Sequence, residues 1–268
     1  MTRGQLDADE ALRLVGEGTM NVEGRLVDAS NATFYCEVSL DGLTGACVYK
    51  PVRGERPLRD FPSGSLANRE VATYLLSAAT GWNLVPPTLL RDGPFGEGMC
   101  QLWIEHDTGM GLVDVVPREH VPAGWRRVLD AYDGDGDEIA LVHADDPALR
   151  QLAIFDVICN NADRKGGHVL VAAEDQSLFG VDHGLTFHVD HKLRTVLWGW
   201  AGEPLSAEEL EVLEKLQTGL SGGLGESLAE LIEIDEIAAL SARIGRLRRE
   251  GGFPEPGDGW PSIPWPVF

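Results

Sequence analysis

Alternating apolar and polar positions dominate the first hundred residues and predict short β-strands. Residues 23–51 read as antiparallel strands separated by polar turns, and residues 83–105 return to strands around a glycine-rich turn. Between them, residues 65–80 place apolar side chains near one helical face and stop before Gly81, a suitable C-terminal cap. A short helix is also expected over residues 7–16. The N-terminal part is therefore predicted to be β-rich with one long helix.

From about residue 120 the periodicity shifts towards helices. Residues 147–162 have an amphipathic helical pattern, and residues 168–197 read as short strands. Helices are expected over residues 206–220, which open with a Ser-x-x-Glu capping box, and over residues 226–250.

These patterns predict an α+β fold, and a chain of this length forms either one large domain or two small lobes that share a cleft. The β-rich N-terminal part, or N-lobe, spans residues 1–105, and the mainly helical C-terminal part, or C-lobe, spans residues 106–250. A connector is expected near residues 105–120, and a Pro- and Trp-rich tail covers residues 251–268.

Composition narrows the choice of partners. The 268 residues are 43% hydrophobic, which is enough for a real core. The net charge of −21 argues against nucleic acid and against a polybasic membrane patch, since both need clustered Lys and Arg. No signal peptide and no run of about 18 apolar residues occurs. We therefore expect a cytoplasmic protein without stable membrane insertion, in which the scattered cysteines are reduced and buried.

Polar residues interrupt an apolar pattern in FDVICNNADRKGGHVL, residues 155–170. Asp163 follows the expected helix and precedes two glycines, so its carboxylate should lie in a tight loop. Asp182, in GVDHG, follows a strand-like run in a similar way. Loop aspartates are common turn formers, but two of them beside short strands could serve as a base and a metal ligand.

A lysine and an acid in the N-lobe suggest a second polar group. Lys50 ends the apolar strand ACVYK, and Glu70 lies in the expected helix. A lysine at a strand end often only reaches solvent, whereas in a cleft it would contact phosphates and need an acid to orient it. The polar turn at residues 28–34 could hold phosphate oxygens, although ordinary β-turns have the same composition.

Other site patterns are discounted. DGDGDE, residues 133–138, begins like a calcium loop, but Glu138 stands where glycine is needed, so an acidic surface turn is expected. His183, His188 and His191 have no second Cys or His cluster to complete a zinc site. The Walker-type motif is absent.

Four segments, in chain order, resemble the phosphatidylinositol 3- and 4-kinase-like superfamily within the protein-kinase-like fold. The resemblance runs from Gly24 to Trp200 and is closest to the type II phosphatidylinositol 4-kinase branch and its small bacterial relatives. VYKP is similar to the strand that ends in the ATP-contacting lysine, and NREVATYLLSAATGWNLVPPT to the helix with the partner glutamate and its following strand. NNADRKGGHVL stands where the catalytic loop is expected, and GVDHG where the metal-binding motif is expected. The resemblance implies a bilobal protein-kinase-like fold.

The resemblance also implies ATP as the nucleotide and Mg²⁺ or Mn²⁺ as the cation. Asp182 would hold the metal between phosphate oxygens, and Asp163 would orient or deprotonate the acceptor hydroxyl. Arg164 and Lys165 would stand beside Asp163, and Lys165 could help to neutralise the transferred phosphate. Lys50 would contact the phosphates, with Glu70 holding it in place. The phosphate-covering turn would be formed by Ser30, Asn31 and Thr33. The hinge strand that meets adenine would include Gln101, Trp103 and Ile104.

One position departs from the superfamily's pattern. Five residues after the catalytic aspartate the superfamily has a metal-binding asparagine, and this chain has His168. A neutral imidazole binds divalent cations, but Mg²⁺ prefers oxygen, so His168 as a ligand favours Mn²⁺ or a single metal. Asn161, just upstream, is an alternative ligand.

Together these residues predict ATP-dependent phosphotransfer to a hydroxyl group on a protein, a soluble small molecule or a lipid. The acidic charge counts against a lipid in a bilayer. Lys192, Arg194, Trp198 and Trp200 are candidates for acceptor contacts, although both tryptophans also suit the core. The alternatives are a nucleotide-binding pseudokinase that regulates a partner, an AMPylase-like protein nucleotidyltransferase and, more weakly, a metal-dependent hydrolase.

Overall fold

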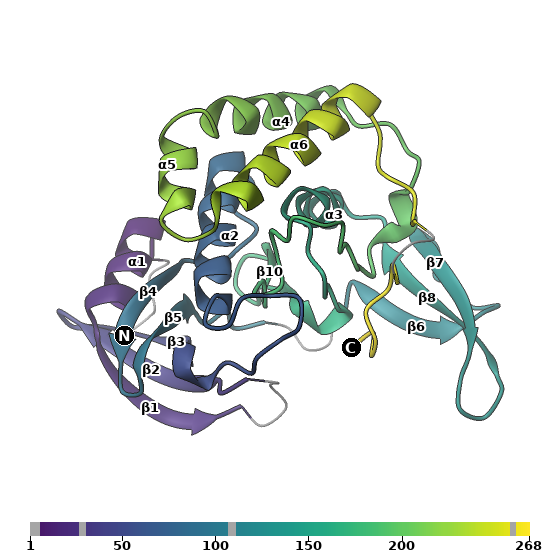
Figure 1. Cartoon of the computed structure of the whole chain (residues 1–268). Coiled ribbons are helices and arrows are strands. Elements are labelled where there is room, and N and C mark those ends of the chain that lie inside the picture. Colours follow the sequence, from purple (N-terminus) through teal and green to yellow (C-terminus); the bar gives the residue numbers. More distant parts are fainter. Residues whose placement is uncertain (1–5, 27–30, 107–110, 258–260) are drawn as a thin grey trace.

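Five antiparallel strands form the sheet of the N-lobe, in the order β1-β2-β3-β5-β4 (Figure 1). The structure is a computed structural model, and it describes residues 6–26, 31–106, 111–257 and 261–268. The strands are β1 (Thr19–Arg25), β2 (Phe34–Leu40), β3 (Leu43–Pro51), β4 (Thr88–Gly93) and β5 (Gly96–Leu102). Side chains alternate as the sequence predicts: Cys36 and Val38 are buried, whereas Glu37 between them is exposed.

Helix α1 (Ala8–Glu17) covers one face of this sheet. Asp7 caps the helix, because its carboxylate accepts the Glu10 N–H at 2.8 Å. Leu14 and Val15 pack with Cys36 and Cys47 in the N-lobe core. All four cysteines of the chain are buried and free, as expected.

Helix α2 (Leu66–Thr80) belongs to both lobes. It stands between the sheet and the upper helices (Figure 1) and ends at Gly81, whose φ of 81° is the predicted left-handed cap. Val71 packs with Met99 of β5, whereas Leu76 packs in the C-lobe core. This helix therefore connects the sheet to the helical half of the molecule.

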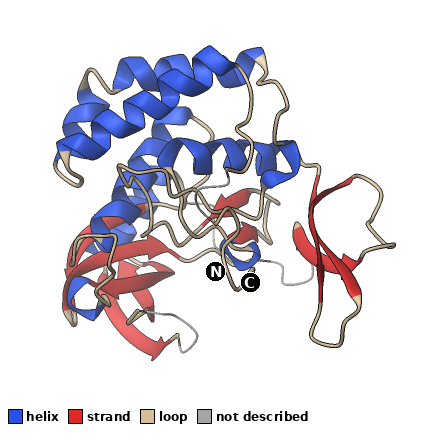
Figure 2. Cartoon of the chain, turned by 45° about the vertical axis from the view of Figure 1, so that its right-hand side comes forward, coloured by secondary structure: helices blue, strands red, loops and turns tan. Residues whose placement is uncertain are grey.

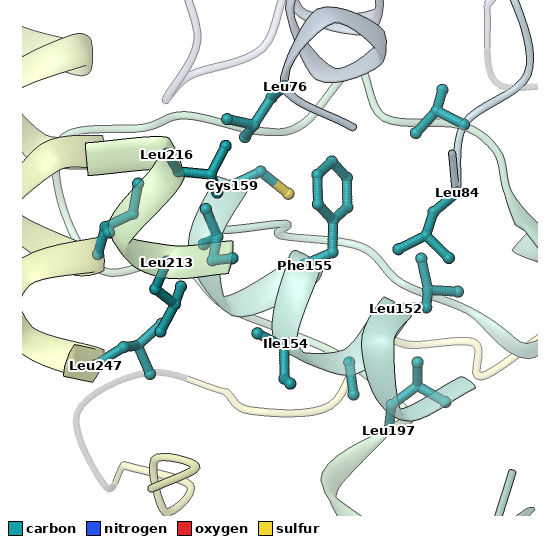
Figure 3. Close-up of a cluster of buried hydrophobic side chains, with 14 of the residues drawn as sticks. Leu76, Leu84, Leu152, Ile154, Phe155, Cys159, Leu197, Leu213, Leu216 and Leu247 are labelled. Carbon is teal, nitrogen blue, oxygen red and sulfur yellow. The ribbon is translucent and has the colours of Figure 1, made fainter. Parts of the chain in front are cut away.

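The C-lobe is built around a central helix, α3 (Pro147–Cys159). Figure 3 shows Phe155 and Cys159 of this helix among leucines of α2, α4 and α6, including Leu76, Leu216 and Leu247. The surrounding helices are α4 (Ala207–Gly219), α5 (Gly223–Ala229) and α6 (Ile234–Glu250). Short 3₁₀ turns occur at Val52–Gly54, Gly166–His168 and Trp198–Trp200. The expected fold class, a bilobal protein-kinase-like α+β fold, is confirmed by this arrangement.

A three-stranded sheet was not expected from the sequence. It consists of β6 (Val113–Pro117), β7 (Trp125–Tyr132) and β8 (Glu138–Ala144) in the order β6-β8-β7, and it lies apart from the other sheet (Figure 2). Part of the expected connector, residues 105–120, is therefore a strand. The DGDGDE segment, residues 133–138, is exposed and joins β7 to β8, which confirms the predicted acidic surface turn.

Two other expectations are wrong in detail. The helix predicted over residues 226–250 is broken at residues 230–233 into α5 and α6. Strands β9 (Val169–Val171) and β10 (Leu178–Gly180) form as expected, but residues 181–197 contain no strand. Side-chain anchors hold this segment instead. For example, Asn160 donates to the carbonyls of His188 and Asp190.

The C-terminal tail is extended and returns to the centre of the molecule (Figure 1). The Ser262 carbonyl accepts the Thr195 N–H at 3.0 Å and the Trp198 indole N–H at 2.8 Å. The Val267 carbonyl accepts the Gly166 N–H at 2.8 Å. Within the described part of the chain, no helix has both the length and the hydropathy needed to cross a membrane.

Candidate active site

A cavity of about 390 Å³ lies between the two lobes, a volume in the range of small-molecule sites. From the N-lobe it is lined, among others, by Asn31, Thr33, Lys50, Gln101, Trp103 and Ile104. From the C-lobe it is lined by His106, Asp163, Lys165, Gly167, His168, Asp182 and two apolar residues. Most of the residues singled out in the sequence thus meet in one space.

Lys50 is the centre of the charged end of this cavity. Its ammonium lies 2.7 Å from Glu70 Oε1 and 2.8 Å from Asp182 Oδ1. Burial lowers the pKa of Lys50, but the carboxylates of Asp182 and Glu70 outweigh burial and raise the pKa above its ordinary value. Lys50 in turn holds the pKa of Asp182 well below its ordinary value. The lysine and Asp182 are therefore both charged at neutral pH.

Glu70 also joins the lysine to the segment that carries Asp182. Its second oxygen, Oε2, accepts the backbone N–H of His183 at 2.8 Å. Asp182 itself has a φ of 60°, a left-handed conformation that aspartate tolerates better than most residues. Its side chain remains 51% exposed, so the carboxylate is accessible from the cavity.

Asp163 faces the same cavity from the opposite loop. Its carboxylate lies 3.2 Å from the Lys165 ammonium, and its N–H donates to Asn161 Oδ1 at 3.0 Å. Because both Asp163 and Lys165 keep about a fifth of their side-chain surface exposed, they can be reached from solvent.

Arg164 does not line the cavity. Its fully buried guanidinium binds both carboxylate oxygens of Asp156, on α3. It also donates to the carbonyls of His168 and Val181, each at 3.1 Å, and lies 2.6 Å from His183 Nε2. Arg164 therefore ties the Asp163 loop to the Asp182 loop, which is a positioning task.

The two asparagines of the opening motif are also structural. Asn161 is fully buried, and its amide donates to Asp156 Oδ1 while its carbonyl accepts from Asp163. Its side chain is occupied in this way and does not line the cavity, so it is not placed to bind a metal there. Asn160 ends α3 in the left-handed conformation and holds residues 188–192.

His168 lies beside Asp182, with Nε2 at 3.4 Å from Asp182 Oδ2. Burial lowers the pKa of the imidazole, so the ring is neutral at neutral pH. Its other nitrogen, Nδ1, is buried and has no partner among the described residues. If the proton of this neutral ring is on Nδ1, the lone pair of Nε2, the nitrogen beside Asp182, can accept from a donor or bind a cation.

Part of the cavity wall is apolar. Its apolar lining residues include Leu26, Val48, Leu102, Leu170 and Val181, and Trp103 and Ile104 also line it. The Trp103 N–H donates to the Ala46 carbonyl, whereas the Ile104 N–H has no backbone partner within the described ranges.

The other residues predicted to bind the nucleotide differ in whether they line the cavity and in how far their side chains are free to bind. Ser30 lies outside the described residues. Thr33 lines the cavity but is almost fully buried, and Asn31 also lines it, although its side chain already accepts the Arg56 N–H at 2.9 Å. Gln101 lines the cavity, and its amide donates to Thr88.

The candidate acceptor residues lie outside the cavity. Trp198 and Trp200 are buried, and their indole N–H groups donate to the Ser262 carbonyl and to Asp145, so both belong to the packing of the C-lobe. Lys192 pairs with Asp60 of the N-lobe at 2.9 Å. Arg194 donates to the Ala162 carbonyl, close to the Asp163 loop.

Several residues that organise the site were not predicted to do so. Asp156 and Arg69 are buried ionic residues, and His183, considered in the sequence only as a zinc ligand, is a buried histidine. A signal was present for Asp156, because an acid within the apolar run LAIFDVIC must either find a buried partner or face solvent. No comparable signal marks Arg69, whose partners are far away in the sequence.

The metal-binding side chains in the cavity suit a cation that takes most of its ligands from a substrate and from water. The described residues include no group of three or more His, Cys, Asp or Glu side chains placed to hold a metal. Asp182 and His168 together offer one carboxylate and one imidazole. Mg²⁺ is commonly held by one or two carboxylates plus substrate phosphates and water, so a nucleotide would have to complete the shell.

Comparisons with known proteins place the chain in a family. It is 49% identical over 269 residues to "Protein Rv2133c" of Mycobacterium tuberculosis, across 97% of this chain and 96% of that protein. No protein-family model matches the chain. Among solved structures, a Helicobacter pylori proinflammatory kinase, CtkA, is similar with a TM-score of 0.42 and 11% identity, over 88% of this chain and 93% of that one. A likeness this low carries no argument about activity.

Proposed function

We propose that this chain, which belongs to the same family as the M. tuberculosis protein Rv2133c, is an ATP-dependent phosphotransferase. One observation carries the proposal: Lys50 from the N-lobe and Asp163 and Asp182 from the C-lobe face a single cavity. An ammonium and two carboxylates in a cleft between lobes are the groups that phosphoryl transfer needs, because its catalysis is mostly positioning and charge neutralisation.

The lining of the cavity suggests the pose of the nucleotide. The apolar walls and the Ile104 N–H, which has no backbone partner within the described residues, suit an adenine ring, and Lys50 suits the α- and β-phosphates. Glu70 holds the Lys50 ammonium in place. Lys50 pairs directly with Asp182 here, and a bound triphosphate would compete for the same ammonium.

In the proposed step a hydroxyl oxygen of the acceptor forms a bond to the γ-phosphorus. The bond from that phosphorus to the bridging oxygen breaks, ADP leaves, and the hydroxyl proton passes to the Asp163 carboxylate. Lys165, 3.2 Å from Asp163, would meet the transferred phosphoryl group as it approaches the acceptor. Arg164 would act through the two loops that it joins and would touch neither reactant.

A Mg²⁺ or Mn²⁺ ion would neutralise the phosphate oxygens when bound. Asp182 and His168 are the side chains that would hold it. The acceptor is a hydroxyl compound, and a protein or a soluble small molecule suits the net charge of −21 better than a bilayer lipid does. Kinship with the phosphatidylinositol 3- and 4-kinase-like superfamily rests on the four sequence motifs.

ATP turnover tests the proposal. Purified protein is incubated with Mn²⁺ or Mg²⁺, with α- or γ-labelled ATP, and with candidate acceptors including the protein itself. We expect label from the γ-phosphate to be transferred, and we expect Asp163→Asn and Asp182→Asn each to lower the rate at least about 100-fold. The exposed carboxylate Asp175, which does not line the cavity, gives a control variant, Asp175→Asn, that should keep the full rate.

The other outcomes are distinct. Transfer of the α-label would indicate a nucleotidyltransferase instead. ATP binding with no turnover on any acceptor would indicate a pseudokinase, the alternative that His168 raises. Absence of nucleotide binding in a folded protein would overturn the proposal.

A further inference from the structure

Directly after Asp182 the chain makes one tight turn, residues 183–186, that helix α2 holds at both ends. At the start of the turn, the His183 N–H donates to Glu70 Oε2 at 2.8 Å. At its end, the Thr186 carbonyl accepts from Arg69 Nη1 at 2.6 Å. The Thr186 hydroxyl closes the turn by donating to the His183 carbonyl, also at 2.8 Å. Two consecutive residues of α2 therefore fix the backbone that follows Asp182.

Arg69 is unusual because its charge is buried. The residue is 1% exposed, and its Nη2 lies 2.7 Å from Glu236 Oε1, on helix α6. Ser65 Oγ accepts from Nε at 3.2 Å, and the guanidinium lies 5.0 Å from the centre of the Phe61 ring. A buried guanidinium needs such partners, since an unpaired charge in the interior is costly.

Glu236 is committed to the same cluster. It is 7% exposed, and its second oxygen accepts the Glu233 N–H at the start of α6. The Arg69–Glu236 pair thus joins the helix that carries Glu70 to the last helix of the C-lobe. The main cleft contacts of α2, to Lys50 and His183, involve Glu70, the next residue along the helix.

We propose that Arg69, held by Glu236, is a positioning residue for Asp182. This inference rests on the proposed function in so far as Asp182 binds a metal–nucleotide complex. Arg69 touches neither the cavity nor Asp182. It acts by fixing the turn at residues 183–186, so that the Asp182 carboxylate keeps its place opposite His168 and Lys50. Glu236, on a distant helix, thereby influences the metal side of the cleft.

A double variant separates positioning from simple stabilisation. Arg69→Met with Glu236→Gln removes both buried charges, and the glutamine can still accept the Glu233 N–H. Replacing a whole buried pair is often neutral for stability. We therefore expect the melting temperature of the double variant to stay within about 3 °C of wild type, whereas each single variant, which leaves one charge unpaired, should melt lower.

The deciding readout is amide hydrogen exchange of residues 183–187, measured without nucleotide. In the folded double variant we expect these amides to exchange about tenfold faster, as for the loss of one hydrogen bond to a charged group. The control is Arg150→Met, which removes another arginine paired with glutamates, Glu203 and Glu209, away from the cleft. It should leave this exchange unchanged. Unchanged exchange in the folded double variant would overturn the positioning role.

Two further measurements keep the test decisive. If the double variant does not fold, Arg69→Lys takes its place. Lysine keeps the charge but cannot bind Thr186, Glu236 and Ser65 together, so the amides of residues 183–187 should exchange faster in this variant too. Unchanged exchange in that variant would also overturn the inference. In nucleotide titrations, the double variant should lose about tenfold in ATP affinity with Mn²⁺ and keep its metal-free affinity within about twofold. If wild type binds no nucleotide, the proposed function fails, while hydrogen exchange still decides the role of Arg69.

Discussion

Asp163 and Arg164 are neighbours with opposite environments. The carboxylate of Asp163 lines the cavity and keeps part of its surface in solvent, whereas the guanidinium of Arg164 is fully buried against Asp156. In the sequence the two form one motif and suggest one shared role. In the structure the first can reach a substrate, and the second can only hold the loops that surround it.

This contrast predicts different consequences of substitution. Arg164→Met leaves the buried carboxylate of Asp156 unpaired, so we expect it to lower the free energy of unfolding by about 3–5 kcal/mol. Asp163→Asn, at the edge of the cavity, should change that free energy by less than about 0.5 kcal/mol. Urea unfolding followed by circular dichroism measures both. Equal destabilisation by the two variants would contradict this division of roles.

Much of the candidate site could be predicted at the residue scale. For Lys50, Glu70, Asp163 and Asp182, the motif and the local pattern predict the same role. Lys50, Asp163 and Asp182 line the cavity, and Glu70 pairs with Lys50. The sequence could not show that Arg164 is structural, because its burial depends on Asp156, eight residues earlier on α3, and on loops that only folding brings together.

At the scale of elements, the C-terminal tail closes onto the Asp163 loop. The Gly166 N–H donates to the Val267 carbonyl, and a Cβ atom at Gly166 would overlap the ring of Phe268. Gly167, the next residue, is exposed, and a Cβ there would meet nothing within 4 Å. The two glycines look equivalent in the sequence, but only the first has a neighbour that excludes a side chain.

We therefore expect Gly166→Ala and Gly167→Ala to differ. The first overpacks the tail and should cost about 1–3 kcal/mol in unfolding free energy, with faster protease cleavage within residues 251–268. The second should leave tail cleavage at the wild-type rate. Adding Phe268→Ala to Gly166→Ala makes room for the methyl group and should recover part of the lost stability. Cleavage at the same rate in both single variants would show that the tail does not pack here.

An element could be predicted from the sequence when its own residues determine it, and could not when residues elsewhere in the chain do. Helices α2, α3 and α4 carry their own periodicity and caps, such as Gly81, Asp146 and Ser206, so the sequence locates them well. The strands of the three-stranded sheet depend on pairing across residues 113–144, and that pairing has no local signature. The segment 181–197 is held by side chains of other elements, including Arg69 and Asn160, so its lack of strands was not visible in its own pattern.

For the whole molecule, the lobes are joined by more than the hinge. Helix α2 packs with the N-lobe sheet through Val71 and with the C-lobe core through Leu76, and the Asp60–Lys192 pair spans the two lobes. Lys50 and Asp182 form a further contact across the cleft. The arrangement favours cooperative unfolding of the two lobes, so stability can be treated as a property of the entire chain.

That stability should fall as the pH drops below 6.5. Burial is the main cause that lowers the pKa of His143, His168, His183 and His191 below their ordinary value. When the pH falls through 6.5, the unfolded chain takes up protons on these histidines before the folded chain does, which favours unfolding. Each contributes at most about 1.4 kcal/mol per pH unit, between pH 6.5 and its own lower pKa.

His143 offers the cleanest test, because it lies outside the cavity. Its ring is fully buried, contacts the Ala144 carbonyl and accepts the Gly199 N–H; among its charged neighbours, Arg126 opposes protonation and Asp145 favours it. We expect urea unfolding at pH 7.0, 6.0 and 5.0 to give a smaller pH slope for His143→Gln than for wild type, whatever the variant's absolute stability. The pKa values of Asp60, Asp145 and Asp182 are lowered from an ordinary value of 3.8, mainly by Lys192, Arg126 and Lys50 respectively, so these carboxylates titrate below this window. Equal pH slopes for wild type and His143→Gln would contradict this prediction, because they would mean that the folded protein accommodates a charged His143. The contact between His143 on β8 and Gly199 would then have to open to let water reach the ring.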